Sequence, residues 1–312
     1  MANDFLTVAD MVADAYDLSG QETSEVRAAA PVVASLPAIP ASNGIVHKQS
    51  VMTQLPVTGF RSENAGRDFD HSVDRIDTVD LKILDWSWMV DKAVADSSRF
   101  GGGREQYIAR EGMRHIQSAM FNLEQQWIYG TANNAAGFNG LLDSTNLDAL
   151  GDEMVVDAGG TTASTASSVF LLRRNSAECG LVYKGDGGVM LGETIVQNFV
   201  DGSGLNLPSY YTPACGWFAG FFGSLYSVAR ICNITEDSGK GLTDELIYQA
   251  LERFPAGHSP DLMIMNRRSQ FQLRASRTAT NVTGAPAPMV MEVAGVPVMT
   301  TDAILSTEAL EV

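Results

Sequence analysis

The sequence has few of the residues that build redox centres and metal sites. Its 312 residues include three cysteines and four histidines. Cys179, Cys215 and Cys232 show no CxxC spacing, and their odd number does not suggest a disulfide framework. The histidines are scattered and match neither HExxH nor another metal-ligand spacing. We therefore expect free thiols in a reducing compartment, with no metal and no cofactor.

Long apolar runs are also missing. No stretch approaches the roughly 20 apolar residues that a transmembrane helix requires. The first residues, MANDFLTVADMVADAYDL, lack the basic n-region and the continuous apolar h-region of a signal peptide. With 45% hydrophobic and 19% charged residues, the composition is that of a folded protein. The sequence predicts a protein that is made in a cytoplasm and does not enter a membrane.

Basic residues are outnumbered by acidic ones. The 21 Lys and Arg against 37 Asp and Glu give a formal net charge of -16. An acidic surface repels phosphate groups, so we expect no sequence-specific binding of nucleic acid. The two arginine pairs, Arg173-Arg174 and Arg267-Arg268, are short, and we interpret both as solvated or structural.

Catalytic motifs are absent from the sequence as well. It contains no GxSxG nucleophile elbow and no GxxxxGK[ST] phosphate loop. The string FGGGRE precedes a predicted helix, whose N-terminus could hold an anion, but a flexible joint is the simpler interpretation. We predict no catalytic and no cofactor-binding residues. An enzyme with an unrecognised site remains an alternative.

One acidic cluster comes closest to a cation site. It comprises Asp68, Asp70, Asp74, Asp77 and Asp80, with His71 among them. The order of acids followed by glycine that a calcium-binding EF-hand loop requires is missing. We interpret these charges as a device that keeps an exposed strand pair soluble and prevents edge pairing with the wrong partner.

The most informative stretch is a predicted β-hairpin over residues 46–92. HKQSVMTQLPVTGF and RIDTVDLKILDWSW alternate like strands, and the polar RSENAGRDFD between them forms the tip. A two-stranded ribbon is at best marginally stable alone in water. We therefore expect it to lie against a second layer.

The residues before the hairpin form a predicted arm over 1–45. Phe5, Ala9, Val12 and Tyr16 recur at helical spacing, and six acidic residues precede the first basic one, Arg27. The following AAAPVVASLPAIPASNG is predicted to be extended, because its prolines interrupt regular structure. An arm of this kind is not a domain of its own.

A long helix is predicted over Arg104 to Gly130. Its apolar residues recur at spacings of three and four and predict one buried stripe: Met113, Ile116, Met120, Leu123 and Trp127. At 1.5 Å per residue the helix is roughly 39 Å long. A helix of that length spans a whole domain and is interpreted as a spine.

The rest of the chain predicts a block of strands followed by a helix, a strand, a helix and a closing strand pair. Thr243 and Asn266 are the predicted N-caps of the two helices, PDLMIMN is a short buried strand, and the closing pair turns at Gly295. Strands and helices segregated in this way indicate an α+β protein.

Several of these strings, in this order, resemble the major capsid proteins of tailed bacteriophages, which have the Hong Kong 97-like fold. The similar strings are QQWIYGTANNAAGFNGLLD, SSVFLLRRNSAECGLVYKGDGG, LYSVARICNI, PDLMIMNRRSQFQLR and VAGVPVMTTDAI, together with the hairpin. The order of the pieces carries the resemblance, which covers most of the chain.

The resemblance implies a division of the chain into functional parts. These are an N-terminal arm (1–45), an extended loop (46–92), a peripheral domain with the spine helix (93–165, helix about 104–130), and an axial domain whose strands return to the peripheral sheet (166–312). In this family the extended loop lies across a neighbouring subunit, which would supply the missing second layer. The short acidic arm further suggests a separate scaffolding protein, or assembly without one, and no removal of a propeptide.

The function implied is self-assembly into pentamers and hexamers that form an icosahedral head enclosing double-stranded DNA. The expected partners are other copies of the chain and scaffolding, portal and decoration proteins. The expected location is the virion, after synthesis in the host bacterial cytoplasm. The predicted inter-subunit contacts are Arg61, Glu63, Arg67, Asp68, Asp70, Trp86 and Trp88. An encapsulin-like nanocompartment shell and a minor virion protein remain alternatives.

Overall fold

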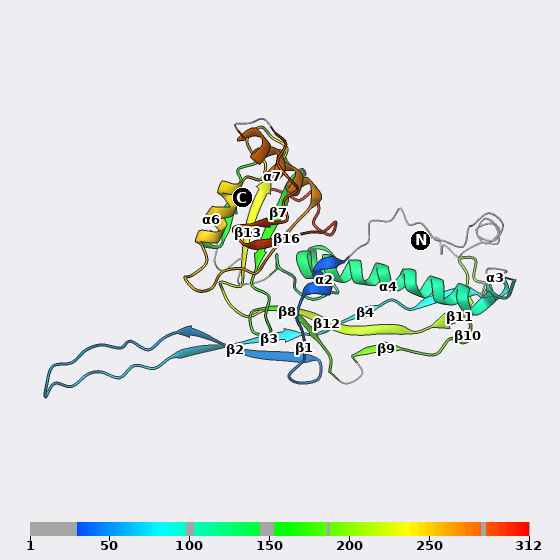
Figure 1. Ribbon diagram of the computed structural model, residues 1–312. Helices are drawn as coiled ribbons and strands as arrows, with labels where there is room; N and C mark the ends of the chain where they lie inside the picture. Colours follow the sequence, from blue (N-terminus) through cyan, green and yellow to red (C-terminus); the bar gives the residue numbers. More distant parts are fainter. Residues whose placement is uncertain (1–29, 98–102, 144–152, 186–187, 282–284, 312) are drawn as a thin grey trace.

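A computed structural model describes residues 30–97, 103–143, 153–185, 188–281 and 285–311 (Figure 1). The predicted N-terminal amphipathic helix lies outside these residues, as does most of the predicted glycine joint before the spine helix. The described chain has three parts: a base that contains the long helix, a lobe above one end of the base, and a two-stranded ribbon that projects from the same end. The mixture of helices and sheets confirms the α+β class.

The helices are α2 (Pro31–Ser35), α3 (Lys92–Ser97), α4 (Gly103–Tyr129), α6 (Asp244–Glu252), α7 (Arg267–Ala279) and the 3-10 helix η1 (Gly130–Ala132). The strands are β1 (Ala38–Pro40), β2 (Val46–Gln54), β3 (Val73–Asp80), β4 (Lys82–Asp85), β5 (Trp88–Asp91), β6 (Val155–Asp157), β7 (Ser167–Leu172), β8 (Cys179–Tyr183), β9 (Val189–Leu191), β10 (Ile195–Val200), β11 (Asn206–Thr212), β12 (Ala214–Phe222), β13 (Val228–Ile234), β14 (Leu262–Met265), β15 (Glu292–Val293) and β16 (Val296–Thr300).

The ribbon consists of β2 and β3, which pair antiparallel from Val46 opposite Asp80 to Gln54 opposite Val73. Its second strand is shorter than predicted. Leu81 is buried, and the following strands leave the ribbon: β4 pairs with β12, and β5 pairs with β11. The alternating pattern of the sequence continues across this change of partner, so the prediction extended the ribbon into the base.

The base holds two sheets beneath the long helix α4 (Figure 1). One sheet has the order β1-β8-β12-β4, with β9 also paired to β12, and the other has the order β10-β11-β5. Trp127 of α4 is completely buried over the first sheet, and its indole N–H donates to the carbonyl of Gly180 at 3.2 Å. The helix and the sheet therefore share one apolar core.

Helix α4 begins and ends within one residue of the prediction, but its buried face is different. Leu123 and Trp127 are buried as predicted. Met113 and Met120 are 66% and 39% exposed. The apolar residues that α4 buries in place of these two are Tyr107, Ile108, Ala119, Ile128 and Tyr129. The predicted stripe thus mixes core residues with residues that face outward.

The segment before the ribbon is more ordered than predicted. Pro31 begins the short helix α2, where its missing N–H costs no hydrogen bond. Pro40 ends β1, which pairs in parallel with β8 at one side of the sheet. The prolines therefore lie at positions that tolerate them, and the prediction of a merely extended stretch was wrong for residues 31–35.

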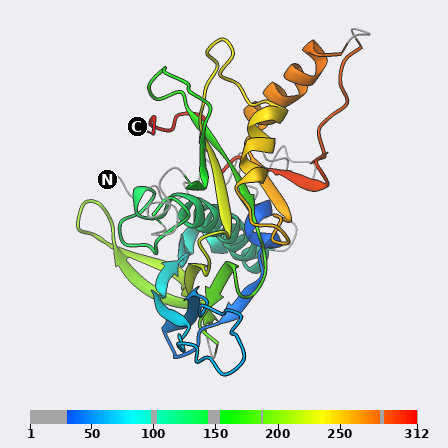
Figure 2. The ribbon, with the colours of Figure 1, turned by 90° about the vertical axis from the view of Figure 1, so that its left-hand side faces the viewer.

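The lobe is built on a six-stranded sheet with the order β15-β16-β14-β7-β13-β6. Helices α6 and α7 touch each other and lie on one side of the lobe in Figure 2. Both predicted N-caps are confirmed, because the Thr243 side chain accepts from the N–H of Leu246 and the Asn266 side chain accepts from the N–H of Ser269. The closing strand pair, β15 and β16, is also confirmed.

The chain passes between lobe and base more than once. Strand β7 lies in the lobe, β8 to β12 lie in the base, and β13 returns to the lobe. Strand β6, in the range predicted to be peripheral, also joins the lobe sheet beside β13. The two parts are therefore interleaved in the sequence, and no single cut separates them.

Candidate functional site

Metal-ligating side chains do not cluster in the described part of the chain. No group of three or more His, Cys, Asp or Glu side chains in this part of the chain could hold a metal ion. The three cysteines are free thiols, and burial raises the pKa of Cys232 to about 11, which keeps it protonated near neutral pH. The features that need a functional explanation are exposed apolar surfaces, and we treat them as the candidate site.

The ribbon tip, residues 55–72, is the first such surface. Phe60 is fully exposed and Phe69 is 88% exposed, and Leu55 and Val57 are exposed beside them. The tip extends far beyond the base (Figure 1). Large apolar side chains gathered on a projecting segment mark an interaction site.

The predicted charged contacts also lie on this tip, and all five are exposed. Arg61 donates to the carbonyl of Ala65 at 3.1 Å, and Arg67 donates to the carbonyls of Asp68 and Val57. The following charged side chains form no ion pair within the described residues: Arg61, Glu63, Arg67, Asp68 and Asp70. Their charges are available to a partner.

Asp70 shapes the tip from within. Its carboxylate accepts hydrogen bonds from the N–H groups of Val57, at 3.0 Å, and His71, at 2.9 Å. These two bonds favour the charged form and lower the pKa of Asp70 below its usual range. Asp70 therefore joins the two segments that lead from the strands to the tip, as well as presenting charge.

The two tryptophans named as contact candidates lie in the base and not on the ribbon. Trp88 is 7% exposed, and its ring packs so closely on Gly112 of α4 that an added Cβ would lie 2.6 Å from it. Trp86 is half-buried between two apolar clusters. Their positions follow from the pairing of β4 and β5 with base strands, and the small exposed part of Trp88 lines a groove in the base.

A groove in the base is the second apolar surface. It lies between the first half of α4 and the strands β5, β9 and β11, and its volume is about 560 Å³. Its lining combines apolar residues with the charged pair Arg104 and Glu105; the apolar lining residues are Trp88 of β5, Ile108, Ala109, Met113 and Ile116 of α4, and Leu191 of β9. Met113 and Leu191 are exposed. Two residues of the predicted helix stripe, Met113 and Ile116, therefore line this groove.

The strands beneath the groove extend the apolar surface. Their exposed apolar residues are Val189, Met190, Leu191, Ile195, Val196 and Val200. A sheet edge that carries so many apolar side chains tends to pair or aggregate when it is left uncovered. This side of the base therefore also has the character of a subunit contact.

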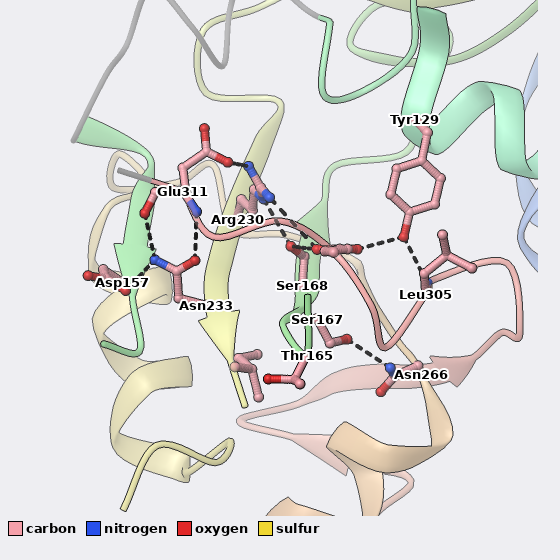
Figure 3. Close-up of polar contacts among 12 residues, drawn as sticks. Tyr129, Asp157, Thr165, Ser167, Ser168, Arg230, Asn233, Asn266, Leu305 and Glu311 are labelled. Carbon is pink, nitrogen blue, oxygen red and sulfur yellow. Dashed lines mark hydrogen bonds and ion pairs between the residues drawn. The ribbon is translucent and has the colours of Figure 1, made fainter. Parts of the chain in front are cut away.

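A buried polar network joins the lobe to the base (Figure 3). The carboxylate of Glu308 accepts from the hydroxyl of Tyr129, at the end of α4, and from the hydroxyl of Ser168 in β7, each at 2.6 Å. Arg230 of β13 lies 3.8 Å from Glu308 and pairs with Glu311 at 2.6 Å. The C-terminal segment thus connects the spine helix to the lobe sheet.

A second buried carboxylate holds the start of the described chain. Glu124 of α4 accepts from the N–H groups of Val32, at 2.9 Å, and Val33, at 3.0 Å, and from the hydroxyl of Thr301. Burial raises the pKa of Glu124 and of Glu308 above the usual carboxyl value. Both carboxylates position the base and lobe that carry the exposed surfaces.

The sequence contained signals for part of this site only. The arginine pairs are structural as interpreted: Arg173 pairs with Glu178, Arg174 with Asp261 and Arg267 with Asp302, while Arg268 donates to main-chain carbonyls. The apolar tip residues were missed, although Phe60 directly precedes the charged tip string and Phe69 lies within it, and both are unpatterned aromatic residues in a polar loop. The roles of Glu124 and Glu308 have no sequence signal.

Comparison with protein families gives one match that spans most of the chain. A family model described as major capsid protein GP7 matches residues 24–312. No curated protein matches the sequence. In the described part of the chain, no helix has the length and apolar character to cross a membrane.

Solved structures resemble the whole chain. A chain of bacteriophage Epsilon15 has a TM-score of 0.71 at 17% identity and covers 99% of this chain and 98% of that one. The bacteriophage JBD30 capsid has a TM-score of 0.54 at 13% identity, with 94% and 97% covered. The SrpI encapsulin of Synechococcus elongatus PCC 7942 has a TM-score of 0.39 at 14% identity, with 74% and 97% covered. The first two likenesses confirm the Hong Kong 97-like fold expected from the sequence.

Proposed function

The chain belongs to the major capsid protein GP7 family, and from this premise we propose that its copies assemble into pentamers and hexamers of an icosahedral phage head enclosing double-stranded DNA. The chain is then a structural subunit of the virion and has no enzymatic activity. Its function then depends on the contacts between its copies.

The observation that carries the proposal is the exposed apolar ribbon. Phe60 and Phe69 stand on a projection that no other described segment covers, and a ribbon of two strands is marginally stable alone. A second copy that lies against the ribbon supplies the missing layer. We propose that the ribbon contacts a different part of the neighbouring chain, because a head-to-tail contact of this kind forms rings when its rotation closes.

The charge of the chain suits the inside of a DNA-filled shell. A net charge of -16 keeps the wall from binding packaged DNA, which a cationic surface would bind strongly. We further propose that the charged tip residues form ion pairs between subunits, and that scaffolding, portal and decoration proteins bind the assembled shell. An encapsulin-like compartment has no specific observation in its favour.

Electron microscopy of the protein expressed alone tests the proposal. Negative-stain images are expected to contain closed shells, tubes, or rings of five and six subunits. Shells of phage-head size that package DNA when the other phage proteins are present would distinguish a head from a compartment that encloses enzymes. Compact monomers or dimers that persist when a scaffolding protein is co-expressed would contradict the proposal.

A further inference from the structure

We propose that strand β10 pairs antiparallel with β10 of a second copy across a two-fold axis, with Asn198 opposite the partner's Asn198, and that this contact joins one ring of subunits to the next. This inference rests on the proposed function, because it assigns one contact of the shell. It also goes further, since a head-to-tail contact builds a ring, whereas a closed shell needs contacts between rings as well.

Strand β10 has an open edge. It is the outer strand of the sheet β10-β11-β5, and no strand of the described residues lies on its other side. Ile195, Val196 and Val200 are 50%, 56% and 57% exposed. The strand lies at the end of the base opposite the ribbon (Figure 1). A contact at this edge is therefore separate from the contact that the ribbon makes.

Strand β10 lacks the features that normally protect an edge strand from pairing. These features are charged residues, proline, a bulge or a very short length. The sequence of β10 is IVQNFV, and its register with β11 is unbroken. The other edge strands of the described chain either have no more than three residues or contain a charged residue or proline: β1, β2, β3, β4, β5, β6, β9 and β15. The open edge of β10 is therefore suited to pairing.

The hairpin determines which main-chain groups of β10 face this open edge. The N–H of Asp201 donates to the carbonyl of Leu205 at 2.9 Å, and the register of β10 with β11 continues from this pair. Hydrogen-bonded pairs alternate along an antiparallel ladder. The odd-numbered residues of β10 therefore bond to β11, and the main-chain groups of Val196, Asn198 and Val200 face outward.

Asn198 lies at the centre of this outward-facing set. On β11 it lies opposite Pro208, which has no N–H to donate, in agreement with main-chain groups that face away from β11. The two-fold axis of an antiparallel strand pair passes through a residue that faces its own copy. With the axis at Asn198, the three outward-facing residues form hydrogen-bonded pairs with the second copy, which gives about six main-chain hydrogen bonds.

The side chains of β10 match in this register. With the axis at Asn198, Val196 lies opposite the partner's Val200, and the two asparagine amides lie opposite each other. Pairs of β-branched residues and stacked amides are both favourable between strands. A shift of the axis to either adjacent residue would place Asn198 opposite a valine. The strand is therefore self-complementary about Asn198.

The size of the contact suits a shell better than a free dimer. A pair of six-residue strands buries less surface than a stable interface of two free proteins requires. Copies that are already held in rings present their β10 edges in fixed positions, so that many weak contacts act together. We therefore expect this pairing in assembled shells and not between dilute single chains.

Disulfide formation across the axis tests the pairing. The Cα atoms of a hydrogen-bonded pair are about 5.5 Å apart, a distance that a disulfide spans. Shells of Asn198→Cys, oxidised with diamide and run on a non-reducing denaturing gel, are expected to give covalent dimers and nothing larger. The control Gln197→Cys places an exposed cysteine about 8 Å from its own copy in this register and should give few dimers. Wild-type shells oxidised in the same way control for Cys215.

The outcomes separate this inference from the proposed function. Shells of Asn198→Cys that give no dimers would overturn the pairing and leave the capsid role intact. Dimers from Gln197→Cys in equal or greater amount would overturn the assigned register. Failure of the unmodified protein to form any assembly would overturn both the inference and the proposed function.

A charge exchange at the same position provides a second test. Asn198→Lys and Asn198→Asp each place like charges opposite each other at the axis, so the shell yield of either variant alone should fall at least about tenfold. Co-expression of the two variants should restore shells, because unlike charges then meet. Asn198→Gln keeps a neutral amide and should assemble normally. A loss that co-expression does not restore would show that another segment covers β10, and would contradict the inference.

Discussion

The hydroxyl of Tyr129 donates to the carboxylate of Glu308 at 2.6 Å, and this bond joins the end of the spine helix to the C-terminal segment. The same hydroxyl accepts from the N–H of Leu305 at 2.7 Å. Glu308 also accepts from Ser168 of the lobe sheet. One tyrosine therefore helps to hold helix, tail and lobe in a fixed relation, which a rigid shell subunit requires.

Removal of this hydroxyl should destabilise the subunit. Tyr129→Phe leaves the part-buried N–H of Leu305 without its partner and removes one bond from the buried carboxylate of Glu308, at a cost of about 1–3 kcal/mol in the free energy of unfolding. Urea denaturation of the unassembled protein measures the change. Tyr248→Phe, at an exposed position on α6, is the control and should change little. Equal stabilities of the two variants would show that the network is not structural.

The buried carboxyl of Glu124 should make stability depend on pH in a defined direction. Burial raises its pKa in the folded state, so the folded protein holds a proton that the unfolded chain releases near the ordinary carboxyl value. This contribution is fully present below that value and is lost as pH rises through the folded-state pKa. Glu124→Gln cannot ionise and lacks this contribution.

Paired measurements on the wild type and this variant isolate the effect of one carboxyl. The free energy of unfolding of Glu124→Gln, relative to wild type, should be more favourable at about pH 8 than at about pH 4. Glu105→Gln, at an exposed position on the same helix, should show a much smaller change. A difference between wild type and Glu124→Gln that stays constant across this range would contradict the assigned pKa direction.

The loop after the spine helix should tolerate no side chain at Gly140. A Cβ there would lie 2.4 Å from the main-chain nitrogen of Gly130 and 2.6 Å from the carbonyl oxygen of Gln126. Because both neighbours are backbone atoms, neither can rotate away, and Gly140→Ala should cost about 3 kcal/mol or more. Thermal unfolding reports the loss. The control Gly66→Ala, in open space at the ribbon tip, should have the same melting temperature as the wild type.

The ribbon tip should be needed for assembly and unimportant for folding. Replacing residues 55–72 by Asn-Gly joins Gln54 to Val73, which already pair in the ribbon, through a favourable two-residue turn. The melting temperature should remain close to that of the wild type, while closed shells disappear from electron micrographs. Normal shells from the shortened chain would show that the tip is not needed for assembly.

Elements defined by local interactions were predictable from the sequence. Thr243 and Asn266 were identified as caps because a side chain that accepts from its own helix acts over three residues. The spine helix was found by its length and period. The buried face of this helix was predicted only in part. Periodicity shows which apolar residues share a helix face, but it does not show whether a methionine on that face packs in the core of its own chain or faces outward.

Features that depend on contacts far apart in the sequence were not predictable. The alternation around Leu81 says nothing about which strand pairs with it, so the end of the ribbon was misplaced. Glu124 contacts Val32 and Thr301, which lie far from it in the chain. The polar tip string led to a prediction of charged contacts, although the most exposed large apolar side chains there are Phe60 and Phe69. The fold was therefore more accessible from sequence than the contact surfaces.

A cryo-electron microscopy reconstruction of the assembled particle tests the central claim most directly. The account predicts a shell of pentamers and hexamers in which each ribbon crosses to the adjacent subunit. Particles in which the ribbon lies on its own chain, or extends into solvent without contacting another copy, would contradict it.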